Sequence, residues 1–420
     1  VLLLLALCLF LPVDGLAQGQ AKKETRESRF VEALRQRGYF DYAQRYLDDL
    51  ETRASTPADV KAVIAYERAI TYLEAGRAAV SPSEKTPLYD KAVGFLDQFV
   101  KANPNHALAA DANSQRGQIL LGKARVEIWQ SQSPSNVNLR VSFQEAARAQ
   151  VLTARKIFQT AHDQYKKAWK TYPSFLDRVQ QADLFARRKR AEALFMRAQY
   201  DLALCTYEEA QTHDRGNDAY VKLANRAAFE FEEIHTKYRS QVVGLYARMW
   251  QGKCYEEQDD INKAMGIYKE LLGHPGGSAT MRVIQNQVLL FQLMCLNHDE
   301  KQDYLLVINQ STEWVSKRTT RQRRAPEVLA ILWEQVRAQE ALALVRTTSE
   351  KDRNQLLTGA LANCRFIQRW PSKYKDVALF KMRELQVKLR GEAIDPQDFE
   401  TAFGLAHDLF KKIKRHNDAL

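Results

Sequence analysis

A chain of 420 residues in which 45% are hydrophobic and 27% are charged is too apolar to be intrinsically disordered. Its 17 glycines and 11 prolines are too few for a sheet-rich fold, because strands need turn residues at intervals of roughly 8 to 12 residues. The formal net charge of +11 is compatible with an acidic ligand. The prevalence of helix-forming residues predicts an all-α fold.

The first segment has the form of a secretory signal peptide. Residues 1–17 hold an apolar run and a breaker, and Gly15 and Ala17 precede an expected cut before Gln18. The run is too short for a membrane span, which needs about 20 apolar residues, and we expect no transmembrane helix in the mature chain. Because neither an initiator Met nor a basic segment precedes the run, we expect its start to be truncated. Cleavage would place the protein in the periplasm or elsewhere in the cell envelope; a retained anchor is the alternative.

Apolar residues recur with a period near 3.6 along the remaining chain, which predicts helices separated by polar or proline-containing breaks. One helix opens near Pro57, and residues 81–83 with Pro87 predict a loop. The other helices are expected over the ranges 30–37, 41–53, 88–102, 107–131, 137–172, 279–298, 302–318, 326–347, 353–369 and 375–390.

These elements suggest a division of the chain into a flexible leader and three helical regions. The leader is expected at 18–29. Divergent helical repeats are expected over 30–199, where 107–172 forms one long helical hairpin. The clearest repeats lie at 200–275, and further helical repeats at 276–420 are expected to continue past the end of the sequence.

A small residue at Ala92, followed one and two helical turns later by Leu96 and Phe99, sets a spacing that recurs three times further along the chain. A small residue lets two helices approach closely, and the later residues fill the space between neighbouring helices. The three sets are Ala203, Tyr207, Ala210; Ala227, Phe231, Ile234; and Ala264, Tyr268, Leu271.

Residues 245–275 extend this pattern into a complete helix-turn-helix unit that resembles the tetratricopeptide repeat (TPR) family. Gly252, Tyr255, Ala264, Tyr268 and Leu271 fall at the family's signature spacing. The surrounding segment is similar to exported bacterial members. The resemblance implies a TPR-like α-solenoid, a right-handed superhelix of antiparallel helix pairs, here with some lengthened helices.

The resemblance also implies where partners bind. Carried over by position, Tyr246, Met249, Lys253 and Glu256 would line the concave groove in which family members hold a peptide or another protein. The alternative is that these four side chains are solvated or pack between repeats.

Two basic clusters also indicate possible ligands. Residues 187–190 are four consecutive cations, which a helix would spread over most of its circumference, so a solvated face is favoured. The second cluster lies in an expected loop and suits an acidic partner, and we expect neutralisation of Arg321, Arg323 and Arg324 to leave folding intact. It comprises Lys317, Arg318, Arg321, Arg323 and Arg324. Nucleic acid is disfavoured because neither cluster has neighbouring aromatic residues or a recognised module.

No local motif for catalysis, phosphate binding or metal binding is present, so we predict no catalytic, cofactor-binding or metal-binding residues. The four cysteines after the first segment lie among helical apolar residues and are expected to be buried: Cys205, Cys254, Cys295 and Cys364. The sequence therefore predicts a non-enzymatic scaffold for protein–protein interaction in the bacterial cell envelope. The alternatives are a polyanion or membrane-surface binder that uses the basic clusters, and a non-catalytic part of a longer envelope enzyme.

Overall fold

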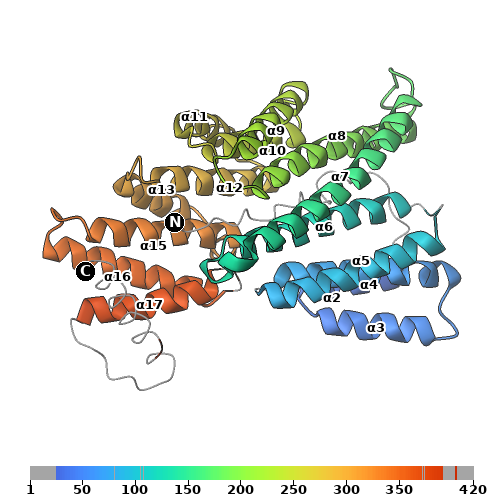
Figure 1. Ribbon diagram of the computed structural model, residues 1–420. Coiled ribbons are helices and arrows are strands. Elements are labelled where there is room, and N and C mark those ends of the chain that lie inside the picture. Colours follow the sequence, from blue (N-terminus) through green and yellow to red (C-terminus); the bar gives the residue numbers. More distant parts are fainter. Residues whose placement is uncertain are drawn as a thin grey trace. The chain divides into compact units, whose positions relative to one another are not determined.

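The computed structural model describes residues 25–79, 81–104, 106, 108–370, 372, 374–390 and Phe403. Sixteen α-helices and one 3-10 helix, with no strand, form this part of the chain, which confirms the all-α prediction (Figure 1). The helices are α2 (Arg26–Gln36), α3 (Phe40–Thr52), α4 (Ala58–Ala78), α5 (Pro82–Ala102), α6 (Ala109–Ser131), η1 (Pro134–Leu139), α7 (Arg140–Lys170), α8 (Ala182–Gln211), α9 (Asp218–Lys237), α10 (Val242–Glu256), α11 (Ile261–Leu272), α12 (Ala279–Leu296), α13 (Tyr304–Ser316), α14 (Thr320–Arg323), α15 (Pro326–Ala343), α16 (Glu350–Ile367) and α17 (Lys375–Arg390).

The chain divides into two compact units, Val1–Asp259 and Asp260–Leu420. In the first unit each helix from α2 to α10 packs against the next one along the chain. In the second, α12 packs against α11, α13 and α15, and α15, α16 and α17 pack in succession. The boundary between the units falls inside the segment 200–275, which the sequence predicted as one region of clear repeats.

The predicted hairpin over 107–172 is confirmed. Helices α6 and α7 are joined by η1 and run antiparallel, since Ser114 approaches the hydroxyl of Tyr165 while Gly117 lies against the ring of Phe158. The structure adds a third long helix, α8, which the sequence analysis did not identify. The expected boundary at 199/200 falls inside α8, whose sequence contains neither glycine nor proline to end a helix.

Two breaks lie elsewhere than predicted. Helix α2 starts at Arg26, within the expected leader, because the hydroxyl of Thr25 accepts a hydrogen bond from the amide of Ser28 and caps the helix. The loop expected at 81–87 is the start of α5. Ser81 caps this helix, and Pro82 occupies the first turn, where a backbone N–H has no helical partner to lose.

The remaining predicted helices are confirmed to within a few residues. The nine residues of the three sets that begin at Ala203, Ala227 and Ala264 are all buried, as a packing role requires. The expectations for residues 1–17 and for the continuation after residue 390 lie outside the described residues, apart from Phe403.

Gly117 tests the packing of α6 against α7. A Cβ at this position would lie 2.7 Å from the Phe158 ring, whereas a Cβ at the exposed Gly94 of α5 would meet nothing within 4 Å. Gly117→Ala should therefore lower the free energy of unfolding by about 1–3 kcal/mol. Gly94→Ala should raise it by about 0.5–1 kcal/mol, because alanine loses less backbone entropy in a helix. Urea unfolding of both variants measures this, and a Gly117→Ala protein as stable as Gly94→Ala would contradict the close approach.

Candidate functional site

The four side chains predicted to line a groove are buried. Tyr246 and Met249 are 0% exposed, Lys253 is 1% exposed and Glu256 is 9% exposed. Their helix, α10, packs against α8 and α9, and the ring of Tyr246 lies 6.4 Å from that of Tyr200. Apolar residues surround α10 on most sides, so it is a buried helix rather than the wall of a groove. The prediction of an open binding surface at these residues is wrong.

Lys253 is held inside the fold by two carboxylates. Its Nζ lies 2.5 Å from Glu256 and 2.9 Å from Glu257. Burial by itself lowers the pKa of Lys253, but the two carboxylates outweigh burial and hold this pKa above its ordinary value. Burial likewise raises the pKa of Glu257, and Lys253 with its neighbours brings it below the usual range. The lysine is therefore paired and charged.

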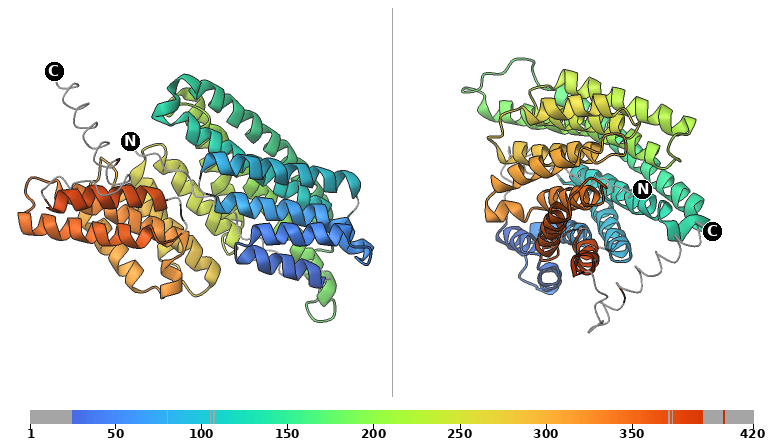
Figure 2. Two further views of the ribbon diagram at one scale, coloured as in Figure 1. Left: turned by 90° about the horizontal axis from the view of Figure 1, so that it is seen from below. Right: turned by 90° about the vertical axis from the view of Figure 1, so that its left-hand side faces the viewer.

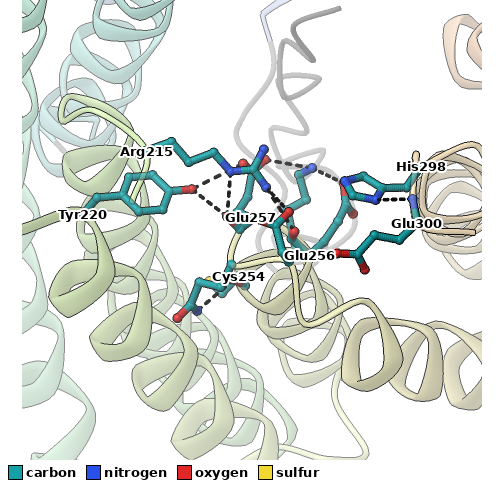
Figure 3. A network of polar contacts seen from close by, with 10 residues as sticks. Arg215, Tyr220, Cys254, Glu256, Glu257, His298 and Glu300 are labelled. Atoms are coloured by element: carbon teal, nitrogen blue, oxygen red, sulfur yellow. Dashed lines mark hydrogen bonds and ion pairs between the residues drawn. The ribbon is translucent and has the colours of Figure 1, made fainter. Parts of the chain in front are cut away.

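The same network satisfies the carbonyl groups at the end of α10 (Figure 3). Arg215, in the link between α8 and α9, donates from Nε to the Glu257 carbonyl at 3.1 Å and pairs with Asp259 at 2.9 Å. The hydroxyl of Tyr220 donates to the same carbonyl at 3.1 Å. The last carbonyls of a helix have no partner within it, so these donors join α9 and the preceding link to α10. This site stabilises the fold.

Removal of Lys253 should leave the buried Glu256 and the half-buried Glu257 without the cation that both contact. We expect Lys253→Ala to lower the free energy of unfolding by about 3–5 kcal/mol. The exposed pair Arg226–Glu230 is a matched control, because Arg226→Ala should change stability by less than about 1 kcal/mol. Chemical unfolding measures both, and equal effects would contradict a structural role for Lys253.

Because the pKa of Glu257 is lowered, the stability that its pairing with Lys253 contributes depends on pH. A carboxyl whose folded-state pKa lies below its unfolded value of about 4.3 stabilises the protein fully above that value, and the contribution is lost as pH falls through the folded-state pKa. The stability difference between the wild type and Glu257→Gln should therefore be largest near neutral pH and shrink below about pH 4. A difference that grows on acidification would have the wrong sign.

Most of the basic cluster at 317–324 takes part in packing. The guanidinium of Arg318 lies 4.1 Å from the centre of the Trp314 ring, and that of Arg324 lies 4.0 Å from the Trp370 ring. The expectation that this cluster has no neighbouring aromatic residues is therefore wrong. Lys317 pairs with Glu313 at 2.6 Å.

Arg323 is bound to the end of α13. Its Nε donates to the carbonyls of Val315 and Arg318, both at 3.1 Å, and a terminal nitrogen donates to Ser316. Within the described residues, Arg321 is the only member of this cluster whose side chain has no ion pair, hydrogen bond or ring contact. The expected loop forms the single turn α14, and neutralising the cluster should disturb folding, contrary to the prediction from sequence.

Arg323 and Arg321 provide a matched pair of substitutions. Arg323→Ala should lower the free energy of unfolding by about 1–2 kcal/mol, because three carbonyl groups lose a charged donor. Arg321→Ala removes the same charge and should have an effect near zero. Thermal unfolding of the two proteins distinguishes them, and indistinguishable melting would mean that Arg323 contributes nothing to the end of α13.

The four cysteines are buried, as predicted, and within the described residues none of them forms a disulfide. Burial raises the pKa of the Cys205 thiol, and that of Cys364 to about 12, so both thiols stay protonated at neutral pH. Among the described residues, no group of three or more His, Cys, Asp or Glu side chains could hold a metal ion. In the same part of the chain, every helix is too short or too polar to cross a bilayer.

Two exposed surfaces remain, of which the sequence analysis identified only the four cations at 187–190, within the second. The first, here called the aromatic surface, lies on α2 and α3 and consists of Phe30, Tyr39 and Tyr42, which are 48%, 52% and 63% exposed. The rings of Tyr39 and Tyr42 are 6.1 Å apart, and the guanidinium of Arg45 lies 5.9 Å from the Tyr42 ring.

The second surface, here called the basic tip, covers residues 164–190: the end of α7, the link to α8 and the start of α8. Its link exposes Phe175 and Val179. Neither surface follows from the local sequence, because exposure depends on which helices pack where.

The chain matches no protein-family model, and no curated protein is significantly similar to it.

Proposed function

We propose that this protein is a non-enzymatic scaffold that binds other proteins, built as a TPR-like α-solenoid and exported into the bacterial cell envelope. The observation that supports the architecture is the packing of consecutive helices in pairs, which is the unit from which such solenoids are made. The apolar run at 1–17 supports export, and N-terminal sequencing of the exported protein, which should begin at Gln18, tests it.

The aromatic surface is the feature that favours protein binding. Single exposed hydrophobic residues are normal, but here three aromatic residues on one helix pair are about half exposed or more, and an arginine lies beside them. Aromatic residues and arginine are enriched at protein interfaces, where they account for much of the binding energy. This surface takes the place of the groove residues that the fold buries.

Partner capture from the cell-envelope fraction tests the proposal. The double variant Tyr39→Ser, Tyr42→Ser should reduce capture of the bound protein by about tenfold or more, since buried aromatic side chains at interfaces are often hot spots. Both side chains are more than half exposed, so folding should be unaffected.

Phe229→Ser provides the control, because Phe229 is 59% exposed on α9, away from the aromatic surface. Capture that is unchanged in the tyrosine variant, or reduced equally by Phe229→Ser, would rule out the aromatic surface as the binding site.

A further inference from the structure

The link between α7 and α8 carries the two most exposed large hydrophobic side chains among the described residues. Phe175 is 84% exposed and Val179 is 87% exposed. Figures 1 and 2 show this link, in green, projecting beyond the neighbouring helices of its unit. Water-exposed apolar side chains at such a position mark a contact surface, because their exposure costs free energy that a partner can recover.

Contacts within the link, and between the link and α8, fix its conformation so that Phe175 and Val179 face outward. Leu176, between them, is buried and anchors the link. The carboxylate of Asp177 accepts hydrogen bonds from the amides of Val179 at 2.8 Å and Gln180 at 2.7 Å, which closes a tight turn. Arg188 of α8 donates to the carbonyl of Ser174. Phe175 and Val179 therefore point away from an ordered turn.

Positive charge surrounds the two apolar side chains. The basic tip contains eight Lys or Arg and two Asp residues. Antiparallel packing brings the last turn of α7 and the first turns of α8 to the same end of the hairpin, as the contact between Arg188 and Ser174 shows. Lys167, Lys170 and Arg187 are exposed and form no ion pair with any described residue. Unlike most of the cluster at 317–324, where only the Arg321 side chain has no partner, these cations are available to a ligand.

We propose that the basic tip docks the protein on the surface of a bilayer that contains anionic phospholipids. The cations contact the phosphate headgroups, whose negative surface potential attracts each nearby Lys or Arg. Phe175 and Val179 enter the boundary between headgroups and acyl chains, where apolar side chains leave water. Long basic side chains suit this arrangement because their stems cover apolar surface while the charge stays among the headgroups.

The apolar side chains favour a lipid surface over nucleic acid. Proteins that bind single-stranded nucleic acid stack aromatic rings on bases. The branched aliphatic side chain of Val179, the most exposed of all, has no flat face to stack, so it gains only by entering an apolar phase. Charge and apolar exposure together match an anionic bilayer.

Co-sedimentation with vesicles tests the proposal. One set of vesicles contains phosphatidylcholine only, and the other contains phosphatidylcholine with phosphatidylglycerol. We expect binding to the anionic set, with affinity that falls steeply as salt is added. Lys170→Gln with Arg187→Gln should weaken binding about tenfold or more, and Phe175→Ser with Val179→Ser should weaken it severalfold. Every variant is made as the mature chain that begins at Gln18, so the apolar run at 1–17 contributes to none of the measurements.

The matched control is Lys317→Gln with Arg321→Gln, which removes the same charge from exposed positions elsewhere and should leave binding unchanged. Equal weakening by the control would show that net charge alone drives binding and would overturn the proposal. Unchanged binding in the Phe175 and Val179 variant, together with competition by single-stranded DNA or heparin, would identify a polyanion site instead. Loss of vesicle binding leaves partner capture by α2 and α3 intact, so the two proposals fail separately.

Discussion

Close approach of neighbouring helices at small residues is the interaction on which the rest of the fold depends. A two-helix unit is too small to bury its own apolar side, so each pair must be covered by the next. Gly117 lets the Phe158 ring lie against the backbone of α6, and the small residues Ala227 of α9 and Ala264 of α11 are fully buried. Larger residues at these places would separate the helices and expose the aromatic side chains between them.

Buried ion pairs add a second constraint within the first unit. Arg125 of α6 pairs with Glu208 of α8 at 2.7 Å, and Arg35 of α2 pairs with Glu67 of α4 at 2.7 Å, all four side chains being under a tenth exposed. Each pair joins helices that are not adjacent in the chain. Such pairs add little net stability compared with apolar packing, but a shifted helix would leave a buried charge alone. Together with Lys253 and its carboxylates, they favour one alignment of the helices.

The sequence predicted the helices well and the binding surfaces poorly, for physical reasons that individual residues show. The apolar period and the breaks around 107–172 are local signals, and they were sufficient to find α6 and α7. Exposure is not local. Lys253 and Glu257, four residues apart, have the spacing of a solvated surface pair, and only the packing of α10 shows that the lysine is buried. Phe175 and Val179 are the opposite case, because they are apolar residues that the fold exposes. An apolar residue near a proline does not predict a projecting link.

The two surfaces proposed for binding lie on different elements of the first unit, the aromatic surface on α2 and α3 and the basic tip between α7 and α8. Both surfaces keep their shape only if each helix pair is covered by the pairs next to it. A fragment of residues 218–257, which holds α9 and α10 alone, tests this dependence most directly. It lacks α8, whose Tyr207 ring lies 4.9 Å from the buried ring of Trp250. Circular dichroism should show no cooperative thermal transition for this fragment, whereas a fragment of residues 109–257 should melt cooperatively. A sharp transition for 218–257 at the melting temperature of the whole chain would contradict the need for neighbouring pairs.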